Sequence, residues 1–186
     1  LRYYLIKEVS FGNDGNISQK KLENCINSDL ANNYGNLCQR VISFSEQNLN
    51  SKIPNDYNFN QDDITILNNF KDKHKKLINF IDSQDINSYV DFIVDQLFAA
   101  NKYFNDQEPW KKKSDIKRLN TIVYVSLELI RKISILLYPI IPQSSAKVLN
   151  IFGITENKID FNTIINNEYL KPNSKISKIS ILFKKI

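Results

Sequence analysis

Apolar residues recur every three or four positions over four long stretches of this chain, which is the period of α-helices with one buried face. The first stretch follows Ser18, a residue type that favours a helix N-cap, and runs to about residue 50, before Pro54. Its apolar stripe consists of Leu22, Ile26, Leu30, Tyr34, Leu37, Val41 and Phe44. We therefore predict one long amphipathic helix over about 18–50.

Three more long helices are predicted. One starts at Asp62 and Asp63, with Ile64, Leu67, Phe70, Leu77 and Ile81 inward. The next starts at Asp85 and ends before Pro109, since proline disfavours the helical conformation of the residue before it. Its buried positions are Ile86, Tyr89, Val90, Ile93, Leu97, Ala100 and Phe104. The last is capped by Ser114 and stops at the next proline.

The two ends of the chain are less regular. Residues 1–9 can form the end of a helix, and a short helix can run from about Pro142 to Gly153. The following residues are polar until 178–183, where clustered apolar side chains need a surface on which to dock. Four long amphipathic helices joined by modest loops predict an all-α fold, an antiparallel helical bundle.

The charge of the chain is unevenly placed. The 186 residues carry a net charge of +5, but five lysines follow Glu168 with no acid among them, and the preceding residues are balanced. Any contact with nucleic acid is therefore expected to be local. No apolar run reaches membrane-spanning length and no signal pattern is present, so we expect a cytoplasmic protein with no membrane partner. Methionine is absent, position 1 included, which we interpret as a piece of a longer protein.

Residue sets for metal binding or catalysis are not found in the sequence. Cys25 and Cys38 lie on one predicted helix, about 20 Å apart and too far for a disulfide. The single histidine, His74, lies among lysines and is interpreted as part of a solvated helix face. No phosphate-binding glycine loop or nucleophilic triad is present. We predict no catalytic residue, no metal and no cofactor in this chain.

Residues 108–113 read Glu-Pro-Trp-Lys-Lys-Lys and place the only tryptophan, Trp110, between a helix-stopping proline, Pro109, and three lysines. An exposed indole stacks on any base for roughly 1–3 kcal/mol, and ammonium groups attract phosphates. The pattern indicates a stacking platform for a base. A tryptophan that closes the edge of the core, with its lysines in water, is the alternative that the residues leave open.

A polar stripe borders the apolar face of the first long helix and consists of Cys25, Asp29, Asn33, Asn36 and Arg40. Asn36 and Arg40 are one turn apart, so an amide and a guanidinium could together bind the edge of a planar base. A solvated face, with Asp29 or an Asn as an intrahelical partner, is the alternative. Gly35 costs about 1 kcal/mol relative to alanine inside a helix. We therefore expect another helix or a ligand to approach it closely.

Five separated motifs carry a resemblance to a known family. They are residues 1–9 (Leu-Arg-Tyr-Tyr-Leu-Ile-Lys-Glu-Val), 11–15 (Phe-Gly-Asn-Asp-Gly), 27–40 (Asn-Ser-Asp-Leu-Ala-Asn-Asn-Tyr-Gly-Asn-Leu-Cys-Gln-Arg), 101–104 (Asn-Lys-Tyr-Phe) and 108–111 (Glu-Pro-Trp-Lys). In this order, and over nearly the whole chain, the sequence resembles the C-terminal half of bacterial methionyl-tRNA synthetase.

The resemblance implies three regions. Residues 1–17 would be the end of a stem-contact region, 18–153 a helical anticodon-binding domain, and 154–186 a tail that docks on the missing catalytic part. It also implies a full-length enzyme that activates methionine with ATP and magnesium and loads it on its tRNA. This chain, without the catalytic domain, would bind RNA without catalysing. Its partners would be tRNA and its own catalytic domain.

The resemblance further implies which residues bind the anticodon. Asn36, Arg40 and Trp110, with Pro109 shaping the tryptophan loop, would recognise the CAU anticodon of methionine-accepting tRNAs, initiator and elongator. Two alternatives stay open: the anticodon-binding domain of another class I synthetase, such as the cysteinyl, valyl or isoleucyl enzyme, and a helical domain that binds protein with Trp110 as an anchor. The run 31–37 (Ala-Asn-Asn-Tyr-Gly-Asn-Leu) and the Pro-Trp pair argue against the first of these.

Overall fold

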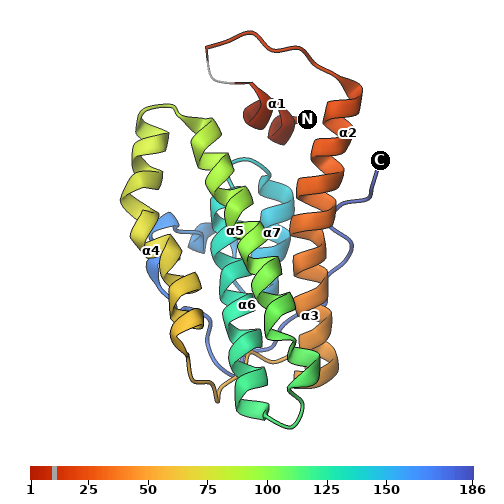
Figure 1. Cartoon of the computed structure of the whole chain (residues 1–186), viewed down its shortest axis with the longest axis vertical. Helices are drawn as coiled ribbons and strands as arrows, with labels where there is room; N and C mark the ends of the chain where they lie inside the picture. The colour runs from red at the N-terminus through yellow and green to blue at the C-terminus, as the bar shows by residue number, and fades with distance from the viewer. Residues whose placement is uncertain (10–11) are drawn as a thin grey trace.

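The computed structural model describes residues 1–9 and 12–186, so Phe11, the first residue of one quoted motif, lies outside the described residues. Helices running side by side in alternating directions form a bundle, with a short helix across one end (Figure 1). In the described part of the chain the only extended pairing is an isolated antiparallel bridge between Lys52 and Lys175. The predicted all-α bundle is confirmed.

The helices follow the predicted order. The first long helix is built from α2 (Gln19–Cys25), a π-helix η1 (Ile26–Gly35) and α3 (Asn36–Leu49). The other long helices are α4 (Gln61–Asp82), α5 (Ile86–Gln107) and α6 (Ile116–Leu137). The shorter elements are α1 (Arg2–Glu8), α7 (Pro142–Ile151) and the 3-10 turns η2 (Pro109–Lys111), η3 (Glu156–Lys158) and η4 (Phe161–Ile165).

Side-chain caps set where the helices begin. Ser18 caps α2 and Asp85 caps α5, both as predicted. The cap of α6 is Asp115 rather than the predicted Ser114. The carboxylate of Asp115 accepts a hydrogen bond from the backbone N–H of Arg118 at 3.0 Å. The backbone N–H of Asp115 donates to the carbonyl of Lys112 at 2.9 Å, which forms a turn in the preceding loop. The helix therefore begins one residue later than predicted.

The start of α4 buries a carboxylate instead of the predicted isoleucine. Asn60 and Asp63 form a reciprocal capping box, with hydrogen bonds of 3.0 and 2.9 Å, and Asp63 is fully buried. Ile64 is 37% exposed and Ile81, near the other end of the helix, is 45% exposed. The inward assignment of these two isoleucines was wrong, whereas the central positions Leu67, Phe70 and Leu77 are buried as predicted.

The first long helix is not uniformly α-helical, as the apolar period had suggested. Ten residues, Ile26–Gly35, wind as a π-helix between two α-helical parts. A Cβ atom at Gly35 would lie 3.0 Å from the carbonyl oxygen of Leu30 and 3.6 Å from the ring of Phe183 in the C-terminal tail. Another helix or a ligand was expected close to Gly35. The close neighbours are instead the carbonyl of Leu30 in the same helix and Phe183 of the tail.

Helix α6 lies at the centre of the bundle, and its residues from Leu119 to Leu137 are buried on every side. Three of them, Glu128, Arg131 and Lys132, are acidic or basic and bind the segment after η3. Arg131 donates to Glu128 at 2.7 Å and to the carbonyl of Asn166 at 2.9 Å, and Glu128 accepts from the backbone N–H of Leu170 at 2.6 Å. Buried charges of this kind are paired because an isolated one is costly.

Two expectations about the outer side of the bundle change. His74 does not lie on a solvated face: it is half-buried, with its ring centroid 5.1 Å from that of Phe161 in η4. The tail packs on the bundle, since Ile176 is buried and Phe183 lies against Tyr34 at 6.2 Å. Ile181 remains 72% exposed, so docking of the tail on a catalytic part stays a prediction.

Candidate nucleic-acid interface

The turn that carries Trp110 is set by local backbone geometry. Helix α5 ends at a residue in the left-handed conformation, Glu108 with a φ of 44°, and Pro109–Lys111 form one 3-10 turn. The N–H of Lys112 donates to the carbonyl of Pro109 at 3.0 Å. Pro109 is buried and Trp110 is 42% exposed. The proline therefore anchors the turn, and the indole keeps an open surface.

Trp110 rests on the core through one aromatic ring. Its ring meets that of Phe104 at 6.1 Å in an edge-on arrangement, and Phe104 is 2% exposed. Phe44 on α3 meets the same Phe104 ring at 5.9 Å, also edge-on. Such pairs fix ring orientation beyond simple burial. Trp110 is thus a partly exposed ring that packs on one buried ring, so part of the indole is open to a ligand.

Arg40 reaches the same phenylalanine from α3. Its Nη2 donates to Oδ1 of Asn105 at 2.6 Å, and its guanidinium carbon lies 5.4 Å from the centre of the Phe104 ring. Arg40 and Trp110, seventy positions apart in sequence, are therefore brought to one ring. Phe104 and Asn105 were not among the predicted site residues, although Asn101 and Asn105 stand one turn apart on α5 and could have indicated a polar face.

Asn36 lies on α3 one turn before Arg40 and is exposed. Among the hydrogen bonds of the described residues, none involves its side chain, which leaves the amide open to solvent. The helix around it is fixed to α5, because the side-chain amide of Asn101 donates to Oδ1 of Asn33 at 2.6 Å. The structure therefore places Asn36 and Arg40 on one exposed side but describes no direct contact between Asn36 and Trp110.

The beginning of the polar stripe is interior. Asp29 is buried and its Oδ2 accepts hydrogen bonds from the hydroxyl of Tyr3 at 2.9 Å and from Nζ of Lys7 at 2.5 Å, both on α1. Burial and the Asp29 charge raise the pKa of the Cys25 thiol to about 11. The alternative of a solvated face does not hold for this part of the stripe, because α1 covers it. Its role is to attach α1 to the bundle.

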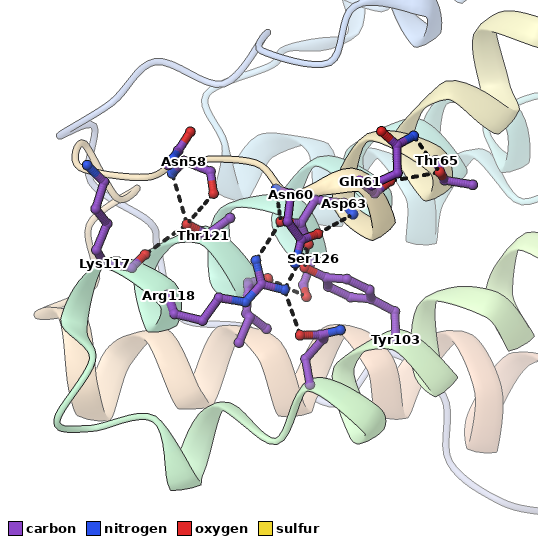
Figure 2. A network of polar contacts seen from close by, with 12 residues as sticks. Asn58, Asn60, Gln61, Asp63, Thr65, Tyr103, Lys117, Arg118, Thr121 and Ser126 are labelled. Atoms are coloured by element: carbon purple, nitrogen blue, oxygen red, sulfur yellow. Dashed lines mark hydrogen bonds and ion pairs between the residues drawn. The ribbon is translucent and has the colours of Figure 1, made fainter.

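A buried polar network joins the start of α6 to α4 and to α5 (Figure 2). Arg118 at the start of α6 donates to both oxygens of Asp63, at 2.5 and 3.0 Å, and to Oε1 of Gln107 at 2.6 Å. The hydroxyl of Tyr103 donates to Asp63 at 2.6 Å. Burial alone would raise the pKa of Asp63, but the hydrogen bonds from Arg118 and Tyr103 outweigh it and lower that pKa. The network ties α4, α5 and α6 together, and its member Gln107 is the last residue of α5 before the turn that carries Trp110.

The charge around this site is positive. Lys111 pairs with Glu108 at 2.7 Å, whereas Lys112 and Lys113 are exposed and form no ion pair with any described residue. Arg40 has a neutral partner, so its charge is not compensated. An open indole, a guanidinium and free ammonium groups can together stack on a planar ring and attract phosphates.

Within residues 1–9 and 12–186, no three His, Cys, Asp or Glu side chains gather as metal ligands. Over the same ranges, no helix combines the length and apolar character needed to cross a membrane.

Comparison with protein-family models gives two matches. Residues 53–186 match the anticodon binding domain of methionyl tRNA ligase. Residues 1–42 match the class I tRNA synthetases of the methionine type.

Individual relatives agree with these matches. The chain is 36% identical over 166 residues to a methionine–tRNA ligase of Brucella suis, covering 89% of this chain and 32% of the relative. It is 34% identical to that of Thermotoga maritima, covering 100% of this chain and 30% of the relative. The crystal structure of the apo form of Mycobacterium tuberculosis methionyl-tRNA synthetase superposes with a TM-score of 0.93 at 32% identity, covering 100% of this chain and 38% of that one. The chain thus spans about a third of the length of these relatives.

Proposed function

The chain belongs to the family of methionyl-tRNA ligase anticodon-binding domains, and from this premise we propose that it binds the CAU anticodon of methionine-accepting tRNA. The observation that carries the proposal is the meeting of Arg40 and Trp110 on the ring of Phe104. This arrangement puts an exposed stacking surface beside a guanidinium with no acidic partner among the described residues.

Recognition would use unpaired bases, because only in single-stranded RNA are the base edges free. One base of the splayed triplet stacks on the open face of Trp110. Arg40 keeps further N–H donors beyond the one bonded to Asn105, and Asn36 offers an amide with both donors and an acceptor. These groups read base edges, while Lys112 and Lys113 attract the phosphates. Pro109 acts indirectly by holding the turn.

The wider role follows from the same premise. In a longer protein with a catalytic domain, this domain would select the tRNA, initiator or elongator, on which methionine is loaded with ATP and magnesium. The chain itself would bind without catalysing, and the cytoplasm would be its location. Residues 1–17 would lead from the stem-contact region into the bundle. The exposed Ile181 of the tail would lie against the catalytic part.

The experiment is binding of RNA hairpins followed by the fluorescence of Trp110, the only tryptophan in the chain. A hairpin with CAU in its loop is compared with the same hairpin carrying a changed triplet, at two salt concentrations. We expect tighter binding of CAU at both salt concentrations, with quenching of the indole on stacking.

Two other results of the hairpin experiment would contradict the proposed recognition of CAU. Preference for a cysteine, valine or isoleucine anticodon would favour another class I synthetase. Weak binding that ignores the triplet and disappears with salt would contradict anticodon recognition by this chain. In that case a helical domain that binds protein would be the remaining interpretation.

A further inference from the structure

A polar groove lies between the first long helix and α5, about two helical turns from Arg40. Its volume is about 560 Å³, within the range of ligand sites. One wall belongs to the first long helix and comprises Asn24, Asn27, Ser28, Asn32 and Asn33, and the other wall belongs to α5 and comprises Phe98 and Asn101. The two helices run side by side in Figure 1. The groove is therefore neutral and rich in amides.

One amide in the groove lacks a partner. Asn33 is 7% exposed, and its Oδ1 and backbone carbonyl both accept from Asn101, at 2.6 and 3.2 Å. Its Nδ2, which is buried, has no hydrogen-bond acceptor in the described part of the chain. A buried N–H donor without an acceptor costs roughly 1–3 kcal/mol. Since the bond to Asn101 fixes the amide, the free donor points to a missing ligand acceptor in the groove.

The backbone that forms this wall is unusual. Asn27, Ser28, Asn32 and Asn33 all lie in the π-helix η1. Such winding is rare and is frequently found at functional sites. Of the amides on this wall, that of Asn27 is bonded to the backbone of Ile186 at 2.7 and 3.0 Å, whereas Asn24 and Asn32 are exposed.

Phe98 supplies the aromatic surface of the groove. It is 57% exposed, although a phenylalanine on a bundle helix is usually buried. Asn101 and Asn105 follow it along α5, and Asn105 binds Arg40. At 1.5 Å per residue, Phe98 lies about 10 Å from Asn105 along the helix axis. The groove is thus an extension of the surface that carries Arg40 and Trp110.

We infer that this groove binds one unpaired RNA base outside the anticodon triplet, stacked on Phe98 and hydrogen-bonded by Asn33. The inference rests on the proposed function, because the triplet brings the neighbouring nucleotide to the groove. A base is the occupant that fits, since it offers a flat face and an edge with donors and acceptors. A phosphate does not fit, because no cation lines the groove.

The test uses hairpins that contain CAU and lack one loop base outside the triplet, replaced by an abasic sugar that keeps the phosphate. We expect one abasic position to weaken binding by about tenfold. With Phe98→Ala, the intact hairpin and this abasic hairpin should bind equally. Phe98→Ala should leave the preference for CAU over a changed triplet intact.

Ile81→Ala is the matched control, since Ile81 is 45% exposed and lies on α4 away from the groove. In Ile81→Ala, the abasic hairpin should still bind more weakly than the intact hairpin, by the same factor as in the unaltered protein. For each abasic hairpin, the loss of affinity relative to the intact hairpin is compared between Phe98→Ala and the unaltered protein. If the two losses are equal at every position, the groove holds no base. If the abasic effect depends on Phe98 but CAU is not preferred, the groove binds a loop base while the proposed recognition of CAU fails. No binding of any hairpin would overturn both.

Discussion

Trp110 meets the edge of Phe104 with 6.1 Å between the ring centroids, and this contact gives the site its orientation. Phe104 is almost fully buried, so its position is fixed by the core. The exposed indole and the guanidinium of Arg40 take their positions from it. A residue that touches no ligand thus determines how two proposed ligand-binding side chains are placed.

Phe104→Leu should therefore disturb the site more than the fold. The leucine keeps most of the apolar volume, and we expect about 1 kcal/mol of lost stability. The indole loses its edge-on partner, so the Trp110 emission should shift to longer wavelength and the CAU preference should fall. Phe44→Leu is the control, because Phe44 touches Phe104 from α3. Equal loss of preference in the two variants would argue against a specific role for the Trp110 contact.

Trp110→Ala should abolish discrimination of the triplet while leaving helicity unchanged. Base stacking contributes roughly 1–3 kcal/mol, so CAU affinity should fall by about 5- to 100-fold. Circular dichroism and hairpin titration measure the two effects. Ile116→Ala, at another exposed position near the start of α6, should change neither. Parallel loss of helicity and binding would identify Trp110 as a core residue.

Arg40→Gln and Arg40→Lys separate charge from shape. Arg40→Gln removes one cation, so the slope of log affinity against log salt should decrease by about 0.7. Arg40→Lys should keep that slope but lose CAU preference, because an ammonium lacks the planar fork of a guanidinium. Arg2→Gln, at an exposed position of α1, controls for net charge. Preserved CAU preference in Arg40→Lys would mean that Arg40 only attracts phosphates.

Asp63→Asn should destabilise the protein by about 3 kcal/mol at neutral pH, since it leaves Arg118 without its ion-pair partner. The folded-state pKa of Asp63 lies below its ordinary value of 3.8. Its stabilising contribution is therefore complete above that value and disappears as pH falls through the folded-state pKa. Denaturant unfolding between about pH 3 and 7 should show a smaller difference between the two proteins at the acid end. Asp62→Asn, at the exposed neighbour, should cost little.

Lys132 should make stability rise with pH just above neutrality. Burial, together with Arg131, lowers its pKa from 10.5 to about 7. Above pH 7 the unfolded chain keeps this proton and the folded one releases it, so the free energy of unfolding increases by at most about 1.4 kcal/mol per pH unit. Urea unfolding between about pH 7 and 8.5 measures this slope, which Lys132→Met should reduce.

That pH window avoids the opposing effect of the thiols. Burial raises the pKa values of the Cys25 and Cys38 thiols above 9.0. Their contribution to the free energy of unfolding therefore decreases only at about pH 9 and above. Lys147→Met, at an exposed position of α7, is the matched control and should keep the slope. An unchanged slope in Lys132→Met would mean that another group titrates.

The sequence by itself determined the helices of this protein and the identity of its proposed site residues. Apolar period and caps such as Ser18 and Asp85 are local signals, because capping and amphipathic burial act within a few residues. The motif around Trp110 is also a local signal, because its proline, tryptophan and lysines are consecutive in the sequence. Its open face was one of two alternatives in the sequence; in the structure the indole is 42% exposed and packs edge-on against Phe104, and its role in stacking on a base stays a prediction.

Only the tertiary structure decided which polar residues are interior and which are available. Asp29 and Asn36 stand on one predicted stripe, yet α1 buries Asp29 and leaves Asn36 exposed. The π-helix and the position of Phe183 against Gly35 were likewise outside the reach of the helical period. Burial, hydrogen-bond partners and the meeting of Arg40 with Trp110 depend on contacts between residues far apart in the chain. No local pattern contains that information.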